Sequence, residues 1–430
     1  MSSDEVSFTD LYREILNLLD KYDKGRKFRL PKDAQVKFNE LSNKFKEVFI
    51  DYVIGDELPQ AYQWLKIVKS SLNEVIRTLG LTGFTFPKEF RSFIEDPLKH
   101  LKKKLFNYVY DLYRGKIDLT EFIYRASAAI RTSLKTNLRT AYQVWGLMTI
   151  LTHLGNDGFR VIYPEHKFLS IDRWGKQKLG IIPPNVVLHS PRYGYLSFFH
   201  EVPRPLTWED SSDLQRVWSL YTALRPDLMV YGGAVMNIVD LSSSPPIKRP
   251  TMIIEFKELE DWYVRVRDLK GYFRKSFTAE EWRSRWITGL YDGLADILGI
   301  QRREVEEKVE KEKSLRVREY QLVQLYYNVY KPKVMILISR KEVPSEIKRV
   351  LKDNNIEVFD AIEFNKEKLK DVTELIKSYA EGSKSSIHLE LDIETYDNLV
   401  KLKELLNLGS EGEVIKYLVN EFMKSVKSLR

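Results

Sequence analysis

The chain has 430 residues, 43% of them hydrophobic and 12% aromatic, which predicts two to four domains with ample core material. It contains no cysteine, which excludes disulfides, thiolate zinc sites, a cysteine nucleophile and a cysteine-ligated iron-sulfur cluster. The formal net charge of +8 favours a polyanionic partner such as nucleic acid. Neither a membrane-spanning apolar run nor a signal peptide is apparent, so we expect a cytoplasmic protein. Abundant Lys, Glu, Ile and Tyr without Cys also resembles the composition of a hyperthermophile's protein.

Residues 1–130 are expected to form an all-α domain. Apolar residues recur at spacings of three and four in the four segments 8–22, 33–54, 57–80 and 87–115. The last segment carries the run Lys102, Lys103 and Lys104. This run is either a phosphate-contacting patch or the solvated face of a helix.

A longer helix is expected over 119–154, followed by a series of strands. The strand segments have the sequences FRVIYPE (159–165), YLSFFHEV (195–202), RPDLMVYGG (225–233) and TMIIEFKE (251–258). A further helix is expected over 208–222. The apolar run 252–254 indicates a strand that is buried on both faces.

Asp227, Glu255 and Lys257 are the candidate catalytic residues at the ends of two of these strands. Residues two apart in a strand share a face, so Glu255 and Lys257 project together. If the two strands pair, Asp227 joins them. A buried acid and lysine are unfavourable unless they pair or bind a metal, although an ordinary surface pair on an edge strand is the alternative interpretation.

Two carboxylates with water or phosphate oxygens suit Mg²⁺, or Mn²⁺ in its place. We therefore expect Asp227 and Glu255 to bind the metal, and the backbone carbonyl of Phe256 is a further possible ligand. Glu201, near the end of its strand, is either a supplementary ligand or a solvated carboxylate. Lys257 would orient a water molecule or offset developing charge.

Pro226-Asp227 followed by Glu255-Phe256-Lys257 resembles the signature of the PD-(D/E)xK, or restriction-endonuclease-like, nuclease superfamily. The resemblance covers about 131–365 and implies an α/β fold for the domain 131–378, with an αβββαβ core whose mixed sheet is flanked by helices. Many members carry a glutamate on the first helix, where this chain offers only Gln143. Many also place a glutamine on the last helix, which implies Gln321 as a catalytic residue, with Gln324 in reserve.

The segment after the Glu255 strand interleaves basic and aromatic residues, which suits phosphate contact and base stacking. An amphipathic helix with core tryptophans is the alternative. The candidate DNA-binding residues are Arg265, Arg267, Arg274, Lys275, Arg283 and Arg285. Residues 301–319 are almost all charged and predict an exposed helix that continues into the apolar 320–331, followed by a buried strand at 334–339 and one more helix and strand within 342–360.

Residues 379–385 are expected to be a linker before a small module at 386–430. One strand, IHLELD, and two helices cannot bury a core alone. The module resembles the ribbon-helix-helix family, which implies a homodimer with paired strands. Ser386, His388 and Glu390 would be exposed on the ribbon, and the acidic Glu390 disfavours direct base reading, so dimerisation is the expected role.

Together these features predict a homodimeric, Mg²⁺-dependent DNA endonuclease. The alternative is a non-catalytic DNA-binding or regulatory protein that uses a nuclease-like scaffold. The absent helix glutamate motivates this alternative.

Overall fold

A computed structural model describes residues 7–172, 181–203, 224–240, 242–243, 245–268, 281–312, 316–382 and 391–428. The helix expected over 208–222 and the first strand of the C-terminal module lie outside these residues. The chain divides into two compact units, Met1–Ser383 and Lys384–Arg430, and each is described by itself.

The N-terminal part of the first unit is built from helices, as the apolar spacing predicts. They are α1 (Phe8–Tyr22), α2 (Lys32–Ile54), α3 (Glu57–Leu79), α4 (Lys88–Glu95), α5 (Pro97–Lys104) and α6 (Phe106–Tyr113). A three-residue strand, β1 (Gly83–Thr85), interrupts them and pairs in parallel with β3 (Phe168–Ser170). One hydrophobic core extends from Phe8 through these helices to the sheet and to Ile376.

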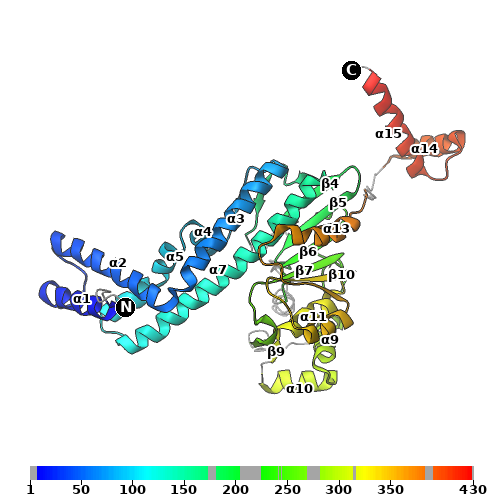
Figure 1. Ribbon diagram of the computed structural model, residues 1–430. Coiled ribbons are helices and arrows are strands. Elements are labelled where there is room, and N and C mark those ends of the chain that lie inside the picture. The colour runs from blue at the N-terminus through cyan, green and yellow to red at the C-terminus, as the bar shows by residue number, and fades with distance from the viewer. Residues whose placement is uncertain are drawn as a thin grey trace. The chain divides into compact units, whose positions relative to one another are not determined.

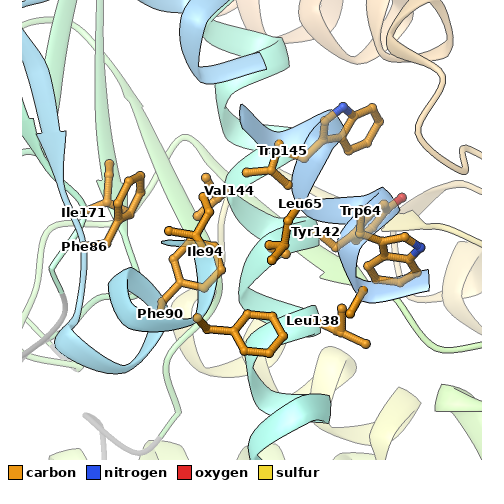
Figure 2. Close-up of a cluster of buried hydrophobic side chains, with 14 of the residues drawn as sticks. Trp64, Leu65, Phe86, Phe90, Ile94, Leu138, Tyr142, Val144, Trp145 and Ile171 are labelled. Carbon is orange, nitrogen blue, oxygen red and sulfur yellow. The ribbon is translucent and has the colours of Figure 1, made fainter. Parts of the chain in front are cut away.

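Helix α7 (Leu119–Asn156) connects this helical part to the sheet (Figure 1). It begins at the N-cap Asp118, whose side chain accepts a hydrogen bond from the Glu121 N–H at 2.8 Å. Residue 130, where the sequence suggests a domain boundary, lies inside this helix. Figure 2 shows Tyr142 and Trp145 of α7 packed among apolar side chains of α3.

The main sheet has seven strands in the order β11-β10-β7-β6-β5-β4-β2. Their bounds are β2 (Arg160–Tyr163), β4 (Val186–Ser190), β5 (Gly194–His200), β6 (Leu228–Gly232), β7 (Met252–Lys257), β10 (Val334–Ser339) and β11 (Ile356–Phe359). Neighbours from β2 to β7 pair antiparallel, whereas β7, β10 and β11 pair in parallel. The expected mixed α/β class is thereby confirmed.

The two faces of the sheet are covered by different helices. Side chains of β7 alternate, so Ile254 and Phe256 join the core beneath α7, and Ile253 joins the core on the opposite face. That opposite face is covered by α9 (Glu281–Leu298), α11 (Glu319–Tyr330) and α12 (Ser345–Asp353), while α13 (Lys370–Ser378) packs beside α7. β7 is buried along its whole length, as its apolar sequence predicts.

The continuous helix predicted from 301 through 331 was wrong. Helix α10 (Arg302–Glu312) is separated from α11 by β9 (Arg316–Arg318), which pairs antiparallel with β8 (Val266–Asp268). Val317 is buried between two exposed arginines, an alternation typical of a strand. As a result, Glu319 is the first residue of a new helix rather than part of an exposed charged face.

The second unit contains two described helices, α14 (Ile393–Leu406) and α15 (Glu411–Ser428). Asp392 caps the first helix by accepting a hydrogen bond from the Thr395 N–H, and Asn407 ends it in the left-handed conformation. Nowhere in the described part of the chain is there a helix with the length and apolar character that a membrane crossing requires.

Gly146 permits the close packing of α7 on β7. A Cβ placed on this residue would lie 2.2 Å from the Phe256 ring. We predict that Gly146→Ala lowers the free energy of unfolding by about 1–3 kcal/mol, because a well-packed core cannot absorb the extra methyl group. Chemical denaturation measures this change.

The loss should shrink when Gly146→Ala is introduced into a Phe256→Leu background, which removes the clashing ring atoms. Gly25→Ala is the control, since its Cβ would meet only the distant Lys27 side chain. A Gly146→Ala protein as stable as the parent would contradict this account of the packing.

Candidate functional site

Asp227 and Glu255 meet where β6 begins and β7 ends. Leu228 is paired with Ile254 in the antiparallel ladder, so the preceding Asp227 lies beside Glu255. The Asp227 N–H donates to Glu255 Oε2 at 3.0 Å, and the Phe256 N–H donates to Asp227 Oδ2 at 2.8 Å. Both carboxyl groups are buried. The structure thus brings together the two acids that the strand pattern selects.

Lys257 lies on the same face as Glu255, as expected from their spacing. Its Nζ donates to Glu255 Oε1 and to Glu319 Oε1, both at 2.9 Å. The ammonium also lies 5.7 Å from the ring centroid of the buried Trp262. Lys257 is therefore held between two carboxylates in a buried position.

Glu319 was missed by sequence reasoning. It follows a long charged run, so it was interpreted as part of an exposed helix. Its position next to Lys257 depends on the break between α10 and α11 and on tertiary packing across 62 residues. The one local signal was a glutamate directly before an apolar run, which is common in the first turn of a helix.

Gln143 approaches the site from α7, where the family resemblance implies a glutamate. Its Nε2 donates to Asp227 Oδ1 at 2.7 Å, and the residue is 1% exposed. Within the described residues, its buried Oε1 has no hydrogen-bond partner. The helix thus supplies a neutral amide, instead of a carboxylate, beside Asp227.

Glu201 and Phe256, the other proposed ligands, also border Asp227. The Glu201 N–H donates to the Asp227 carbonyl at 2.9 Å, so Glu201 follows β5 directly beside the start of β6. Glu201 is buried and has a positive φ of 46°. The Phe256 side chain packs against α7 on the opposite face of β7 from Lys257.

Gln321 is not brought to the carboxylates. At the start of α11, its Oε1 accepts from the Arg318 N–H at 2.8 Å, and its Nε2 donates to the Ile297 carbonyl at 3.2 Å. This side chain therefore caps a helix end. Gln324, the reserve candidate, is buried one turn farther along the helix.

Among the described basic residues proposed to contact DNA, Arg265 lies next to the site. It lines a cavity of about 230 Å³ together with Lys257, and its Nε contacts Asp261 Oδ1 at 3.2 Å. Arg267 lies in β8, and both Arg283 and Arg285 lie in α9. Arg274 and Lys275 lie outside the described residues.

The cavity opens beside Lys257 and is bordered by α7, the β8 segment and the first residue of α11. Its charged lining residues are Lys135, Arg139, Lys257, Glu258, Arg265 and Glu319. Lys135, Arg139 and Gln143 are spaced by four residues, so they follow one another along a single face of α7. This face leads from the cavity to Asp227.

Burial and the neighbouring Glu255 raise the pKa of Asp227 well above its ordinary value. Burial also raises the pKa of Glu258. For Lys257, burial alone would lower the pKa, but Glu255, Glu319 and Asp227 outweigh it and raise the pKa. The carboxyl groups of Asp227, Glu255, Glu258 and Glu319 are all buried near the Lys257 ammonium, and the Arg139 guanidinium acts on two of them, Asp227 and Glu258.

A divalent cation fits the cluster of buried carboxyl groups and the Gln143 Oε1 atom, which accepts no hydrogen bond within the described residues. Mg²⁺ takes only one or two protein carboxylates with water and substrate phosphates. Across the described ranges, however, no cluster of three or more His, Cys, Asp or Glu side chains suited to a metal ion is found. Asp227 and Glu255 would therefore be the two carboxylate ligands, supplemented by the Gln143 oxygen.

Comparison of the chain with protein-family models, with curated proteins and with solved structures gives no match.

We predict that Asp227→Asn raises stability near pH 7 by about 0.5–2 kcal/mol, because a neutral amide replaces a carboxyl group whose charged form is disfavoured by burial and by Glu255. The folded-state pKa of Asp227 lies above the unfolded value, so ionisation destabilises the fold as pH rises from about 4 towards the folded pKa. The Gln143 amide can reverse to present its Oε1 to the new amide group. Denaturation at a series of pH values tests this.

The stability of the parent should fall over that pH window relative to Asp227→Asn, and the exposed Asp353→Asn should follow the parent. A loss of stability in Asp227→Asn at pH 7 would show instead that the ionised carboxylate stabilises the fold.

Proposed function

We propose that the chain is a metal-dependent nuclease of the PD-(D/E)xK type that hydrolyses DNA phosphodiesters. The observation that carries the proposal is the buried meeting of Asp227, Glu255 and Lys257 at the ends of two paired strands. The proposal is supported by α7, β5, β6, β7, α11 and β10, which follow one another in the order of that superfamily's αβββαβ core. β2, β3 and β4 are inserted before β5, and β8, α9, α10 and β9 are inserted before α11.

Asp227 and Glu255 would hold Mg²⁺ or Mn²⁺, with Gln143 Oε1, the Phe256 carbonyl and Glu201 as supplementary oxygens. When bound, the ion would lower the pKa of a water molecule and offset charge on the scissile phosphate. Gln143 fixes the orientation of the Asp227 carboxylate through its 2.7 Å hydrogen bond. Such support by neighbouring polar groups is what keeps ligand oxygens in place.

Lys257 would act on the substrate phosphate or on the attacking water. Its ammonium is kept charged by Glu255 and Glu319. Because Lys257 lines the cavity, it is available to a group that enters there. Arg139 and Arg265 line the same cavity and would stabilise a phosphate in it.

Cleavage of plasmid DNA and of single-stranded DNA with Mg²⁺ or Mn²⁺ tests the proposal. Asp227→Ala and Lys257→Ala should each lower the rate by about 100-fold or more, since electrostatic groups of an active site have effects of this size. The matched controls are Asp353→Ala and Lys352→Ala, which alter an exposed acid and an exposed lysine at the end of α12. Equal cleavage by all five proteins would attribute the activity to a contaminant.

The second candidate function is a non-catalytic DNA-binding or regulatory protein. It is favoured by one observation: both oxygens of Asp227 and both of Glu255 already accept hydrogen bonds within the chain. Calorimetric titration with Mn²⁺ separates the two functions. A nuclease site should bind the ion and lose it in Asp227→Ala, whereas a scaffold should show no heat that depends on Asp227.

Homodimerisation through the ribbon-helix-helix-like second unit is part of the proposal. Among the described residues of this unit, Leu399 and Val414 are buried, whereas Leu405 is 80% and Phe422 is 68% exposed. Ile393, Tyr396, Tyr417 and Val419 are exposed as well. So much exposed apolar surface on two short helices favours burial against a second copy.

Phe422→Glu should convert the dimer to a monomer, because a charge buried in an apolar interface without a partner is strongly unfavourable. Size-exclusion chromatography with light scattering measures the mass, and Lys416→Glu, an exposed position of the same helix, is the control. A Phe422→Glu protein with unchanged mass would place the dimer interface elsewhere or remove it.

A further inference from the structure

A second cavity adjoins the one at the candidate site. It has a volume of about 640 Å³ and lies where α4, α5 and α6 pack beside α7. Thr136 lines both cavities, so the two hollows meet on α7. Together they form a groove, here called the α7 groove, from Tyr124 to Arg139 and on towards Asp227.

The floor of the α7 groove is a row of small side chains at a spacing of four. Ala128, Thr132 and Thr136 are exposed and lie on one face of the helix. The short side chains in this row leave room for a bound molecule along the helix. The distance from Tyr124 to Arg139 is about 22 Å, because 15 residues (139 − 124) rise ~1.5 Å each.

Cations and aromatic rings border this floor. Lys104 and Arg125 lie beside the larger cavity, and Lys135 and Arg139 beside the smaller one. Lys104 is paired with Glu89, an acid that also lines the larger cavity, and Arg125 is paired with Glu121. Such surface pairs contribute little, so a phosphate can replace either carboxylate.

Tyr124 is 78% exposed although it lines the groove, and Tyr108 lines it as well. An exposed ring beside a chain of cations is the combination that binds single-stranded nucleic acid, because bases stack on the ring while phosphates contact the cations. Duplex DNA does not offer base faces, since its bases already stack on one another.

We infer that the α7 groove binds a single strand of DNA and leads it to the Asp227–Lys257 site. This inference rests on the proposed function, because it names the form of the substrate that enters that site. A strand stacked at ~3.4 Å per nucleotide would place about six nucleotides along 22 Å of helix. The occupant is therefore a single-stranded end, flap or gap.

Fluorescence anisotropy of labelled oligonucleotides tests the inference without divalent ions, so cleavage is not needed for a signal. The full chain is titrated with one sequence as single-stranded DNA, as single-stranded RNA and as duplex DNA. The variants are Tyr124→Ala and Arg125→Ala, both exposed positions of α7. The matched controls are Tyr52→Ala, whose ring is 63% exposed on α2, and Arg13→Ala, whose side chain has a similar helical ion pair on α1.

The single strand should bind about tenfold or more tightly than the duplex. Tyr124→Ala should weaken single-strand binding about fivefold or more, as expected for the loss of one stacked base. Arg125→Ala should weaken it and reduce its salt dependence, as expected for the loss of one phosphate contact. If single-stranded RNA binds as tightly as single-stranded DNA, the result supports the inference that the groove binds a single strand, and it extends the inference to RNA.

Equal affinity for duplex and single strand, or effects of Tyr124→Ala no larger than those of Tyr52→Ala, would overturn the inference. Failure of the nuclease proposal is recognised separately. Binding that persists in Lys257→Ala while all proteins lack cleavage overturns the catalysis alone. Cleavage that depends on Lys257 without Tyr124-dependent binding overturns the groove alone.

Discussion

The packing of helix α7 against strand β7 is the contact on which the rest of the first unit depends. Gly146 faces the Phe256 ring so closely that no side chain fits between them. The same contact determines where Gln143 meets Asp227 and where Arg139 meets the smaller cavity. Gln143 and Arg139 lie one and two turns before Gly146 on the same helix, so their positions follow from its packing. The close approach of α7 to β7 at Gly146 therefore positions both the core and the polar site.

The buried charges around Lys257 are not explained by stability alone. A buried ion pair is at best weakly stabilising, and here four buried carboxyl groups lie near two cations, Lys257 and Arg139. An apolar residue in place of Lys257 or Glu319 would extend the hydrophobic core on the α11 side of the sheet. Burial and Glu255 raise the pKa of Asp227, so the folded chain disfavours the ionised form of this carboxyl group. Unfavourable groups of this kind are typical of functional sites.

The alternation of the strands made much of this site predictable from sequence. Glu255 and Lys257 share a face of β7. Asp227 joins them because β6 pairs antiparallel with β7, and the apolar sequence before Glu255 indicates that β7 is a buried strand with neighbours on both sides. Glu319 and Arg139 could not be found in this way, because their positions depend on contacts between distant elements. The family resemblance predicts Gln321 from its place on this helix, but its side chain accepts a hydrogen bond from the Arg318 backbone N–H, as a glutamine at the third position of a helix often does.

Helix α7 lies beneath both the α7 groove and the candidate site, so it links their positions. Tyr124 and Gln143 belong to one 38-residue helix whose inner face is buried for most of its length, so their separation is fixed in the folded chain. A strand held at one end of the groove is therefore held at a defined distance from Asp227. Sites supported by regular elements keep their geometry better than sites on loops. Positioning of a strand in the groove and support of the Asp227 carboxylate would then have the same structural origin, the α7 helix, which Gly146 allows to pack closely against β7.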